Sequence, residues 1–506
     1  MLEKKQLNCD VLIIGGGING CGIAADAASR GLNVILCEKN DLASATSSAS
    51  SKLIHGGLRY LEQFNISFVR KALKEREVLF KICPYLIHPL AFVLPHQTSH
   101  RPFWLLRLGL YLYDHLCKTS VPKTRVLNRK KNPSYFSSLN KNIQRALYYY
   151  DAQTIDSRLV IANALQAKQH KANILTCAQF INTTRYKSHW ESNVTTKTND
   201  VSIISKVLVN ATGPWADTLN QDIKINSPYH LSLVQGSHIV INKLYDGDFA
   251  YLLQNDDKRI VFALPYHSNF TLIGTTDYLI HDIPQTCSIS DEETDYLLSL
   301  TNNYFNKELT TSDIKHSYCG LRPLIKDTTS TKAKDFSRDY KIFNNYDDAP
   351  YTCIYGGKLT TYRLLAKECV DNWQTIFPQM SSCQTKHLAL PGSDFTNINT
   401  LNKNLSCAFS QLPNELLQHY ASLYGSRTFD LLKTCTDLIS LGQFFGGKLY
   451  QVEVDFLIET EWALCCEDII WRRTKQGLVM NNLQIQRLTD YIKNIVTTQV
   501  PVSNRV

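Results

Sequence analysis

The sequence predicts a protein of mixed α/β and α+β class, in which a parallel, Rossmann-like sheet and an antiparallel sheet precede a C-terminal helical domain. Three observations lead to this class. A strand, a glycine-rich turn, a helix and a second strand open the chain within residues 11–37. Alternating apolar strands fill the middle, at about residues 229–320, and helical periodicity takes over near residue 390. Because 506 residues exceed what one hydrophobic core usually supports, we expect more than one domain.

The first elements form a strand–helix–strand unit. Residues 11–14 are apolar and typical of a buried strand, residues 20–30 have a helical pattern, and Gly31 ends that helix. Residues 34–37 form the next buried strand. This order predicts a parallel, Rossmann-like sheet with a right-handed crossover.

A glycine motif lies at the first turn of this unit. Gly15, Gly17 and Gly20 form the pattern GxGxxG, with Asn19 inside it. Glycines here allow the backbone to approach a pyrophosphate, which the positive end of the following helix stabilises. Glu38 ends the second strand, where a carboxylate can hold a ribose hydroxyl. The motif indicates a dinucleotide without separating FAD from NAD, and the alternative is a plain tight turn beside a surface glutamate.

A run of small, hydroxyl-bearing residues follows the second strand. Residues 45–52 read Ala-Thr-Ser-Ser-Ala-Ser-Ser-Lys and lead into residues 53–60, which contain two adjacent glycines. A bulky isoalloxazine ring requires neighbours without large side chains, together with hydrogen-bond donors for its ring and phosphates. By composition alone, a flexible serine-rich linker is an equal alternative.

Five motifs, in order along the chain, resemble those of a known family. They lie at residues 46–60, 210–215, 320–324, 356–363 and 471–475. The chain resembles the FAD-dependent glycerol-3-phosphate dehydrogenases, most of all the bacterial aerobic enzymes. The resemblance implies a fold of the D-amino-acid-oxidase type with FAD as cofactor. It also implies hydride transfer from C2 of sn-glycerol 3-phosphate to flavin N5, which yields dihydroxyacetone phosphate, and a membrane quinone as electron acceptor.

The glycine motif and the resemblance together name the residues expected at the cofactor. Lys358 and Thr360 open an expected helix, and its N-terminus is expected to face the pyrimidine oxygen of the flavin. The alternative for these two residues is a helix cap only. The full set of expected cofactor contacts is Gly15, Gly17, Asn19, Gly20, Glu38, Thr46, Ser47, Ser51, Lys52, Gly56, Gly57, Thr212, Gly213, Gly357, Lys358, Leu359 and Thr360.

Arginine suits the phosphate of such a substrate, because its planar fork binds two oxygens and stays charged. Arg59 and Arg322 each follow Gly-Leu in a loop-like context, and we expect both to clamp the phosphate. Tyr60 and Lys358 are expected as further substrate contacts, and Arg322 is counted among the catalytic residues as well. The alternative for any single arginine is a solvated surface charge.

Two histidines are candidates for the base that removes the proton of the C2 hydroxyl. His55 is the first choice, since it lies beside two glycines and four residues before Arg59, and His238 is the second. Histidine suits this task because its ordinary pKa, about 6.5, lies near working pH. The alternative for either histidine is a contact with the flavin.

An apolar segment with basic neighbours lies within residues 101–131. Residues 103–113 are rich in leucine and aromatic residues, and eight Lys or Arg residues of the longer segment stand against one acid, Asp114. This segment is too short and too charged to span a bilayer, but it suits an interfacial helix. The alternative is a core helix followed by a basic loop. The resemblance favours peripheral attachment to the cytoplasmic face of the inner membrane, and the basic cluster of Arg472, Arg473 and Lys475 is another route.

Composition sets further limits. The net charge of +9 suits an anionic substrate or an anionic membrane surface. The 15 cysteines show no CxxC pair, so we expect reduced thiols in a cytoplasmic protein without a metal site. The polar residues 1–10 and the lack of long apolar stretches predict no signal peptide and no transmembrane helix. No RNA-recognition motif occurs, so we expect no nucleic-acid partner.

We expect interleaved FAD-binding and substrate domains over residues 1–390 and a helical domain over residues 391–506. A homodimer is among the expectations. The first rival activity is an oxidase of the same fold, which would pass electrons to oxygen and release peroxide. An amine or amino-acid oxidase is a second rival, disfavoured by the paired Arg59 and Arg322, and a flavin-holding scaffold without activity is a third.

Overall fold

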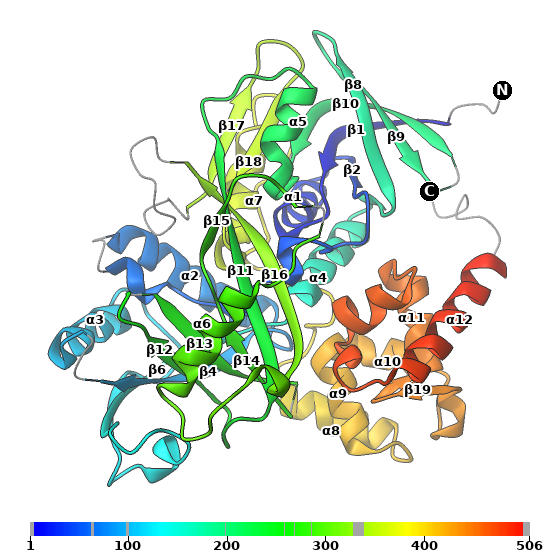
Figure 1. Cartoon of the computed structure of the whole chain (residues 1–506). Helices are drawn as coiled ribbons and strands as arrows, with labels where there is room; N and C mark the ends of the chain where they lie inside the picture. Colours follow the sequence, from blue (N-terminus) through cyan, green and yellow to red (C-terminus); the bar gives the residue numbers. More distant parts are fainter. Residues whose placement is uncertain are drawn as a thin grey trace.

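Two large sheets and a C-terminal group of helices with a small two-stranded sheet make up the described part of the protein (Figure 1). The computed structural model describes residues 5–61, 65–97, 101–197, 199–257, 259–267, 269–284, 286–326 and 339–498. The C-terminal helices, orange to red in Figure 1, lie to one side of the two sheets and next to α4 (Asp156–Gln169).

The first sheet has a parallel centre. Its hydrogen-bonded order is β17-β18-β10-β1-β2-β7, and β1 pairs in parallel with both β10 and β2. β8 and β9 continue from β10 as antiparallel strands. The strands of this sheet within the described residues are β1 (Lys5–Ile14), β2 (Val34–Cys37), β7 (Asn173–Leu175), β8 (Ala178–Arg185), β9 (Trp190–Thr196), β10 (Asp200–Asn210), β17 (Lys341–Asn345) and β18 (Tyr351–Tyr355).

Helices pack on this sheet because their apolar faces share one core with it. α1 (Ile18–Ser29) is rich in alanine and almost wholly buried, and it packs against both α4 and α7 (Tyr362–Asp371). Val11 and Ile13 of β1 belong to the same hydrophobic cluster as these helices. The predicted strand–helix–strand unit and its parallel sheet are therefore confirmed.

The second sheet is mainly antiparallel, as predicted for residues 229–320. Its order is β15-β11-β14-β13-β12-β4-β6-β3, with β16 paired to β11 and β5 paired to β6. The long pairing of β11 with β16 sets His238 opposite Tyr318 and Val234 opposite Arg322. Its strands within the described residues are β3 (Leu53–Ile54), β4 (His88–His96), β5 (Arg125–Asn128), β6 (Arg145–Gln153), β11 (Leu231–Asn242), β12 (Phe249–Gln254), β13 (Ile260–Tyr266), β14 (Phe270–Gly274), β15 (Tyr278–Ile280) and β16 (Ile314–Ile325).

Further helices of the described residues accompany the sheets, namely α2 (Ile66–Ile82), α3 (Phe103–His115), α5 (Ala216–Asp222) and α6 (Asp291–Asn302). α6 begins with a capping box formed by Ser290 and Glu293. It packs along β11, as Figure 1 shows. The helix thereby brings its first turn to the strand that carries His238.

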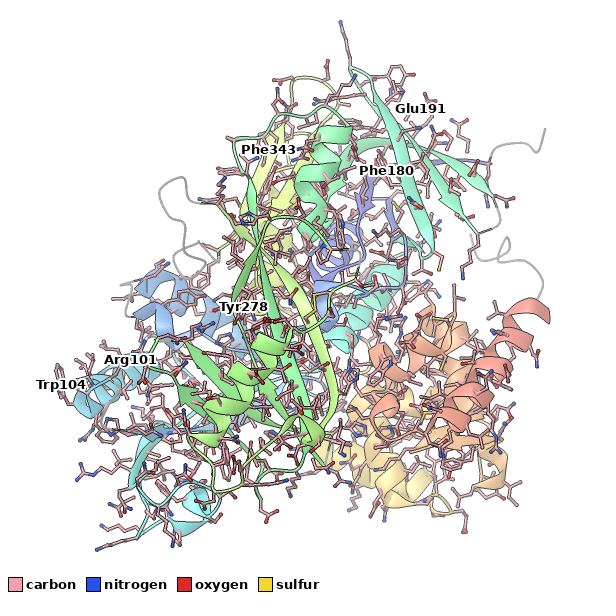
Figure 2. The ribbon with its side chains drawn as sticks, viewed as in Figure 1. Arg101, Trp104, Phe180, Glu191, Tyr278 and Phe343 are labelled. Atoms are coloured by element: carbon pink, nitrogen blue, oxygen red, sulfur yellow. A yellow bond between two sulfur atoms is a disulfide. The ribbon has the colours of Figure 1, made fainter. Side chains whose placement is uncertain are left out.

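α3 lies at the surface rather than in the core. Its buried residues are Leu110 and Tyr113, whereas Trp104 is 67% exposed. Figure 2 shows Trp104 at the outer edge of the molecule, close to Arg101. The alternative prediction of a core helix is therefore wrong. Among the helices of the described residues, none is long and apolar enough to cross a bilayer.

The C-terminal domain is helical, as predicted. α9 ends at Gly425, where the backbone φ is +58° and an added Cβ would lie 1.9 Å from the carbonyl oxygen of Gly392. The domain boundary at residue 390 stays a prediction. Its elements are α8 (Ile398–Ala408), α9 (Asn414–Tyr424), α10 (Thr428–Leu431), β19 (Phe444–Gly446), β20 (Leu449–Tyr450), α11 (Gln451–Glu461) and α12 (Asn482–Thr498).

The basic cluster near the C-terminus is directed inward. Arg473 is fully buried and its guanidinium lies 2.7 Å from the carboxylate of Asp41. Arg472 contacts the same carboxylate at 2.5 Å, and Lys475 is buried. The prediction that these three residues offer a membrane route is therefore wrong, because they join the C-terminal domain to the N-terminal region.

One pair of cysteines departs from the expectation of reduced thiols. Cys287 and Cys319 form a disulfide, and their Cα atoms lie 5.9 Å apart. Cys287 follows β15 and Cys319 lies in β16, so the folded sheet brings together two residues that are 32 positions apart in sequence. The prediction is wrong for this pair, and the other cysteines are free.

Glu461 on α11 lies at the junction of the domains. Burial alone would raise its pKa, but the charges of Arg158 on α4 and of Arg427 outweigh burial and lower the pKa to about 2. Glu461→Gln should leave both arginines without their carboxylate and lower the free energy of unfolding by about 3–5 kcal/mol, measured by chemical denaturation. Because the folded-state pKa lies below the ordinary 4.5, this stabilisation is present above about pH 4.5 and is lost as the pH falls towards 2.

Glu459 supplies the control for this prediction, because it is an exposed glutamate on the same helix. Glu459→Gln should change the free energy of unfolding by less than about 0.5 kcal/mol. Helix propensity changes equally in the two variants. Equal losses of stability in both would contradict the role of Glu461 at the junction.

Candidate functional site

The glycine turn brings three backbone segments into close contact. An added Cβ at Gly15, where φ is +112°, would lie 2.6 Å from the carbonyl oxygen of Ala211 at the end of β10. At Gly20 an added Cβ would lie 1.9 Å from the carbonyl oxygen of Gly15. Neither position has room for a side chain, so at Gly15 and Gly20 the chain presents backbone alone near the start of α1. Such a surface fits the pyrophosphate of a dinucleotide.

Glu38 lies beside this turn. Its Oε2 accepts a hydrogen bond from Gly16 N at 2.7 Å, and its Oε1 accepts one from Asn40 N at 2.9 Å. Partial burial raises the pKa of Glu38, while these N–H donors of Asn40 and Gly16 act against the rise. Each oxygen of a carboxylate can accept a second hydrogen bond, so the predicted contact with a ribose hydroxyl fits the geometry.

The hydroxyl-rich run is bound to neighbouring elements and is not a free linker. Ser47 Oγ accepts a hydrogen bond from Ile18 N at 3.0 Å, at the start of α1. Thr46 Oγ1 donates to the carbonyl oxygen of Leu321 in β16 at 2.7 Å. The run therefore bridges the glycine turn and the second sheet, and the linker alternative is wrong. We call residues 46–60 the flavin loop, after the contact with FAD that the sequence predicts for it.

Lys52 anchors this loop to Asp156 at the start of α4. Its Nζ lies 2.9 Å from Asp156 Oδ2 and 3.0 Å from both Asp156 Oδ1 and the carbonyl oxygen of Ser48. The side chain is almost fully buried. The protein itself therefore engages the ammonium group, which the sequence had placed among the cofactor contacts.

Two further motifs meet the glycine turn. Asn19 Nδ2 donates to the carbonyl oxygen of Gly356 at 3.1 Å, and an added Cβ at Gly357, where φ is +100°, would lie 3.2 Å from the Asn19 amide. Thr212 follows β10 and donates to Asn210 Oδ1 at 2.7 Å, and Gly213 has open space where a Cβ would be. Segments far apart in sequence thus line the same cradle.

Lys358 and Tyr60, two expected substrate contacts, lie together. Lys358 Nζ is 3.9 Å from the centroid of the Tyr60 ring, close enough for a cation–π interaction. Leu359 begins a short helical turn before α7, and Thr360 Oγ1 accepts a hydrogen bond from His55 N at 3.1 Å. The structure describes the backbone of Arg59 but not its side chain.

The two adjacent glycines of the flavin loop are required by their neighbours. An added Cβ at Gly56 would lie 2.6 Å from the Tyr113 hydroxyl, to which Gly56 N donates at 2.8 Å. At Gly57, where φ is +80°, an added Cβ would lie 2.5 Å from the Tyr60 ring. Both positions therefore need glycine whether or not the cofactor contacts them.

Arg322 has protein partners that the sequence did not reveal. Its Nη1 contacts the Asp277 carboxylate and donates to the carbonyl oxygen of Thr276 at 3.2 Å. Its Nη2 donates to Thr275 Oγ1 at 2.6 Å and lies over Gly236, where an added Cβ would be 2.2 Å away. The run of small polar residues after β14 was the signal available in the sequence.

His238 and His55 differ in accessibility. His238 is buried, its Nε2 lies 2.9 Å from Ser51 Oγ, and its ring stacks on Tyr318. Burial, followed by the charges of Arg322 and Lys52, holds the pKa of His238 well below its usual value, so the ring is neutral at working pH. His55 is half-buried, and its ring meets the edge of Phe262.

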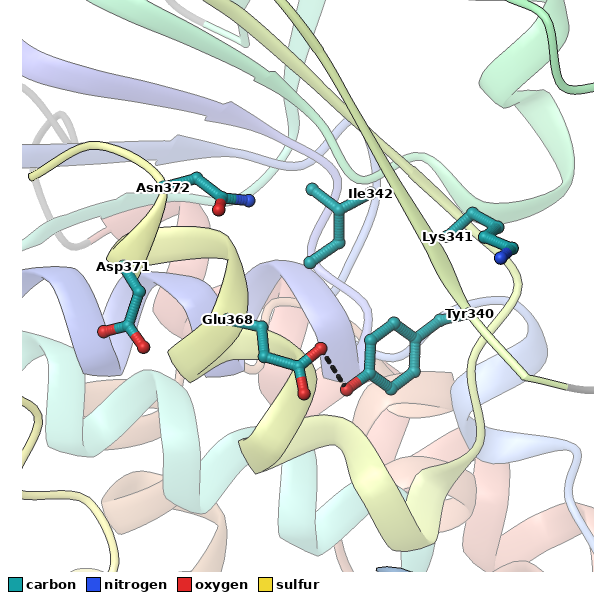
Figure 3. A pocket seen from close by; sticks show the side chains of 6 residues that line it. All are labelled: Tyr340, Lys341, Ile342, Glu368, Asp371 and Asn372. Carbon is teal, nitrogen blue, oxygen red and sulfur yellow. Dashed lines mark hydrogen bonds between the residues drawn. The ribbon is translucent and has the colours of Figure 1, made fainter. Parts of the chain in front are cut away.

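A surface groove lies elsewhere, between β17 and the end of α7 (Figure 3). Tyr340 donates a hydrogen bond to Glu368 across it at 2.6 Å. None of the residues expected at the cofactor or substrate lines this groove, so it has no part in the site. The lining residues are Tyr340, Lys341, Ile342, Glu368, Asp371 and Asn372.

Comparisons with known proteins agree with this geometry. Residues 10–363 match the family model described as FAD dependent oxidoreductase, and residues 383–499 match the C-terminal domain of alpha-glycerophosphate oxidase. A glycerol-3-phosphate dehydrogenase of Pseudomonas aeruginosa is 44% identical over 491 residues, covering 96% of this chain and 95% of that protein. A D-erythritol 1-phosphate dehydrogenase of Brucella abortus is 40% identical over 495 residues, covering 96% and 98%.

A solved structure extends the likeness to three dimensions. The glycerol-3-phosphate dehydrogenase of Bacillus halodurans, complexed with FAD, has a TM-score of 0.77 at 25% identity and covers 100% of this chain and 93% of that chain. The predicted fold class and the predicted cofactor, FAD, are confirmed. The chain therefore belongs to the family of FAD-dependent oxidoreductases.

Proposed function

We propose that this protein oxidises sn-glycerol 3-phosphate to dihydroxyacetone phosphate and passes the electrons to a membrane quinone. The main support is that two cations from separate motifs, Lys358 and Arg322, both border the flavin loop. Lys358 lies over Tyr60 of that loop. Arg322 follows Leu321, whose carbonyl oxygen accepts the hydrogen bond of Thr46. The two relatives named above act on sugar-alcohol phosphates by their names, which agrees with a site built for a phosphate.

The two cations would bind the anionic end of the substrate. Arg322 keeps its charge at all working pH values, and Thr275 and Asp277 hold its fork in one orientation. Gly236 leaves room for the guanidinium above the strand. Binding the phosphate in this way would hold the substrate in the site with its C2 carbon at the flavin.

His55 is the proposed base for the proton of the C2 hydroxyl. Its ring is half-buried and therefore within reach of a ligand, and Thr360 holds its backbone. His238 remains the second candidate, but it is buried and its Nε2 already contacts Ser51. FAD, when bound, would accept the hydride from C2.

Two alternatives share these residues. An oxidase would use oxygen as the acceptor and release peroxide, and the match to a domain of alpha-glycerophosphate oxidase favours keeping this alternative. A dehydrogenase for a longer polyol phosphate is the other, because the Brucella abortus relative is named for D-erythritol 1-phosphate. Substrate and acceptor comparisons separate both from the proposed function.

Attachment to the membrane surface is proposed through α3. The exposed side of this helix carries Trp104, Leu105, Leu108, Tyr111 and Leu112, which are 41–67% exposed. An apolar helix face beside basic residues binds an anionic lipid surface without crossing it. On its inner side, Tyr113 accepts the hydrogen bond of Gly56 in the flavin loop. The proposed location is therefore the cytoplasmic face of the inner membrane, with the cofactor close to the bilayer that holds the quinone.

The first prediction concerns the substrate. Mixing the yellow holoenzyme with sn-glycerol 3-phosphate without oxygen should bleach the flavin absorbance, and glycerol should not. Arg322→Ala should lower the apparent second-order rate of bleaching by at least about a hundredfold, since two charge-assisted hydrogen bonds are lost. The bound flavin should remain, because Arg322 contacts Thr275, Thr276 and Asp277.

D-Erythritol 1-phosphate, tested in parallel, should bleach the flavin more slowly than sn-glycerol 3-phosphate. A quinone analogue should reoxidise the reduced enzyme faster than oxygen does. A faster reaction with D-erythritol 1-phosphate would favour the dehydrogenase for a longer polyol phosphate. Fast release of peroxide would favour the oxidase. Unchanged bleaching in Arg322→Ala would remove that arginine from the site.

The two histidines are separated by single-turnover kinetics. His55→Ala should slow flavin reduction by about 10²- to 10⁴-fold, the usual contribution of a general base, with a smaller effect on substrate binding. His238→Ala should instead loosen the flavin, because it removes the partner of Ser51. Since the pKa of His238 lies well below its usual value, any loss of rate between pH 7 and 6 would not arise from this residue. A larger loss of the reductive rate in His238→Ala would exchange the two roles.

Membrane binding is tested with vesicles. The protein should sediment with anionic vesicles at low salt and be partly released at high salt, because salt screens exposed charges within about 10 Å at 0.1 M. Replacing Trp104 and Leu105 with serine should weaken sedimentation without slowing flavin reduction. Ile439→Ser is the matched control, since Ile439 is 87% exposed on the C-terminal domain. Equal weakening by both changes, or no sedimentation of the unaltered protein, would contradict attachment through α3.

A further inference from the structure

We propose that Glu293, in the first turn of α6, is the positioning residue that holds residues 275–277 around Arg322 and so sets the affinity for the anionic end of the substrate. The inference rests on the proposed function, because it assigns that end of the substrate to Arg322. Glu293 lies on a different element from every residue named so far in the site. Its effect would therefore pass through other side chains.

Glu293 is a buried carboxylate whose two oxygens are both fully used. Oε1 accepts hydrogen bonds from Thr276 Oγ1 at 2.5 Å and from Ser237 Oγ at 2.8 Å. Oε2 accepts from Gln235 Nε2 at 2.7 Å and from Ser290 N at 3.1 Å. The residue is 1% exposed. A charged group at this depth persists only with such partners, so the four donors and the carboxylate constrain one another.

Thr276 carries this constraint to Arg322. Its hydroxyl donates to Glu293 and also accepts a hydrogen bond from Ser237 N at 2.8 Å, which fixes the residue against β11. The Thr276 carbonyl oxygen accepts the bond of Arg322 Nη1. The neighbours on either side, Thr275 and Asp277, hold the rest of the guanidinium. One carboxylate thus determines where three consecutive residues present their acceptors.

Helix capping alone does not account for this arrangement. The capping box of α6 uses Glu293 N, which donates to Ser290 Oγ at 3.2 Å, and the bond from Ser290 N to Oε2. The remaining contacts lie outside the helix: Oε2 also accepts from Gln235 of β11, and Oε1 accepts from Ser237 of β11 and from Thr276 after β14. The cap therefore uses Ser290 alone, and substitutions can separate it from the contacts that Glu293 makes with β11 and Thr276.

Removal of the Oε1 contacts should act on substrate binding more than on the chemical step. A guanidinium that is free to shift binds the phosphate less well in the ground state and in the transition state alike, which raises KM and leaves kcat nearly unchanged. Glu293→Gln keeps the shape of the side chain but turns one acceptor into a donor. It should raise KM for sn-glycerol 3-phosphate at least about tenfold, change kcat less than about threefold, and leave the flavin content unchanged.

Ser290→Ala is the matched control, because it removes only the Ser290 Oγ acceptor of the capping box. It should lower the melting temperature without raising KM. Thr276→Val should raise KM as Glu293→Gln does, and the double variant should be no worse than the worse single variant, since both remove the same contact. Glu293→Asp, which keeps the charge on a shorter arm, should recover part of the affinity.

Several outcomes would overturn the proposal. If Ser290→Ala raises KM as much as Glu293→Gln does, Glu293 acts only as a helix cap. If the increases in KM caused by Thr276→Val and Glu293→Gln are additive, the two residues do not act through the same contact. If Glu293→Gln does not fold, Thr276→Val decides in its place. If sn-glycerol 3-phosphate fails to bleach the unaltered holoenzyme, the proposed function fails. Amide hydrogen exchange of residues 274–278 then decides the inference, because Glu293→Gln should accelerate this exchange. Unchanged exchange would contradict the positioning role of Glu293.

Discussion

The site depends first on the buried ion pair between Lys52 and Asp156. Asp156 opens α4, which packs beside α1, so the pair fastens the flavin loop to the helices of the first sheet. Burial would raise the pKa of Asp156, but the charges of Lys52 and Lys475 outweigh burial and lower it, so the carboxylate stays charged. Ser50 adds a second donor to the same carboxylate at 2.7 Å. An unpaired charge at this depth would cost several kcal/mol, so the loop has little freedom to leave.

With its base fixed, the loop brings the two sheets together. Ser47 contacts the start of α1, Thr46 contacts β16, and Ser51 contacts His238 of β11. The dinucleotide turn belongs to the first sheet, whereas β11 and β16 belong to the second. The flavin loop is thus the physical connection between the part that would hold the cofactor and the part that would hold the substrate.

Cationic side chains lie around the flavin loop, and they differ in their partners. Lys52 has Asp156 as its partner, and Arg322 has Asp277. Lys475 arrives from the C-terminal domain, and burial together with the charge of Lys52 lowers its pKa to about 7. The C-terminal domain therefore takes part in the electrostatics beneath the flavin loop as well as in the ion pairs of Glu461. α3 contributes from the opposite side, since Tyr113 donates to the buried Asp151 at 2.7 Å and supports Gly56.

The sequence by itself determined the elements whose signals are local. The glycine turn, Glu38 and the parallel strand–helix–strand unit were predictable, because periodicity, turn chemistry and motif spacing act within a few residues. Tertiary structure decided the contacts between distant segments. Arg322 meets Asp277 across 45 residues, Ser237 meets Glu293 across 56, and Lys52 meets Asp156 across 104. No local pattern encodes such pairs, because strand register and helix packing create them, and so the sequence named Arg322 but not the groups that orient it.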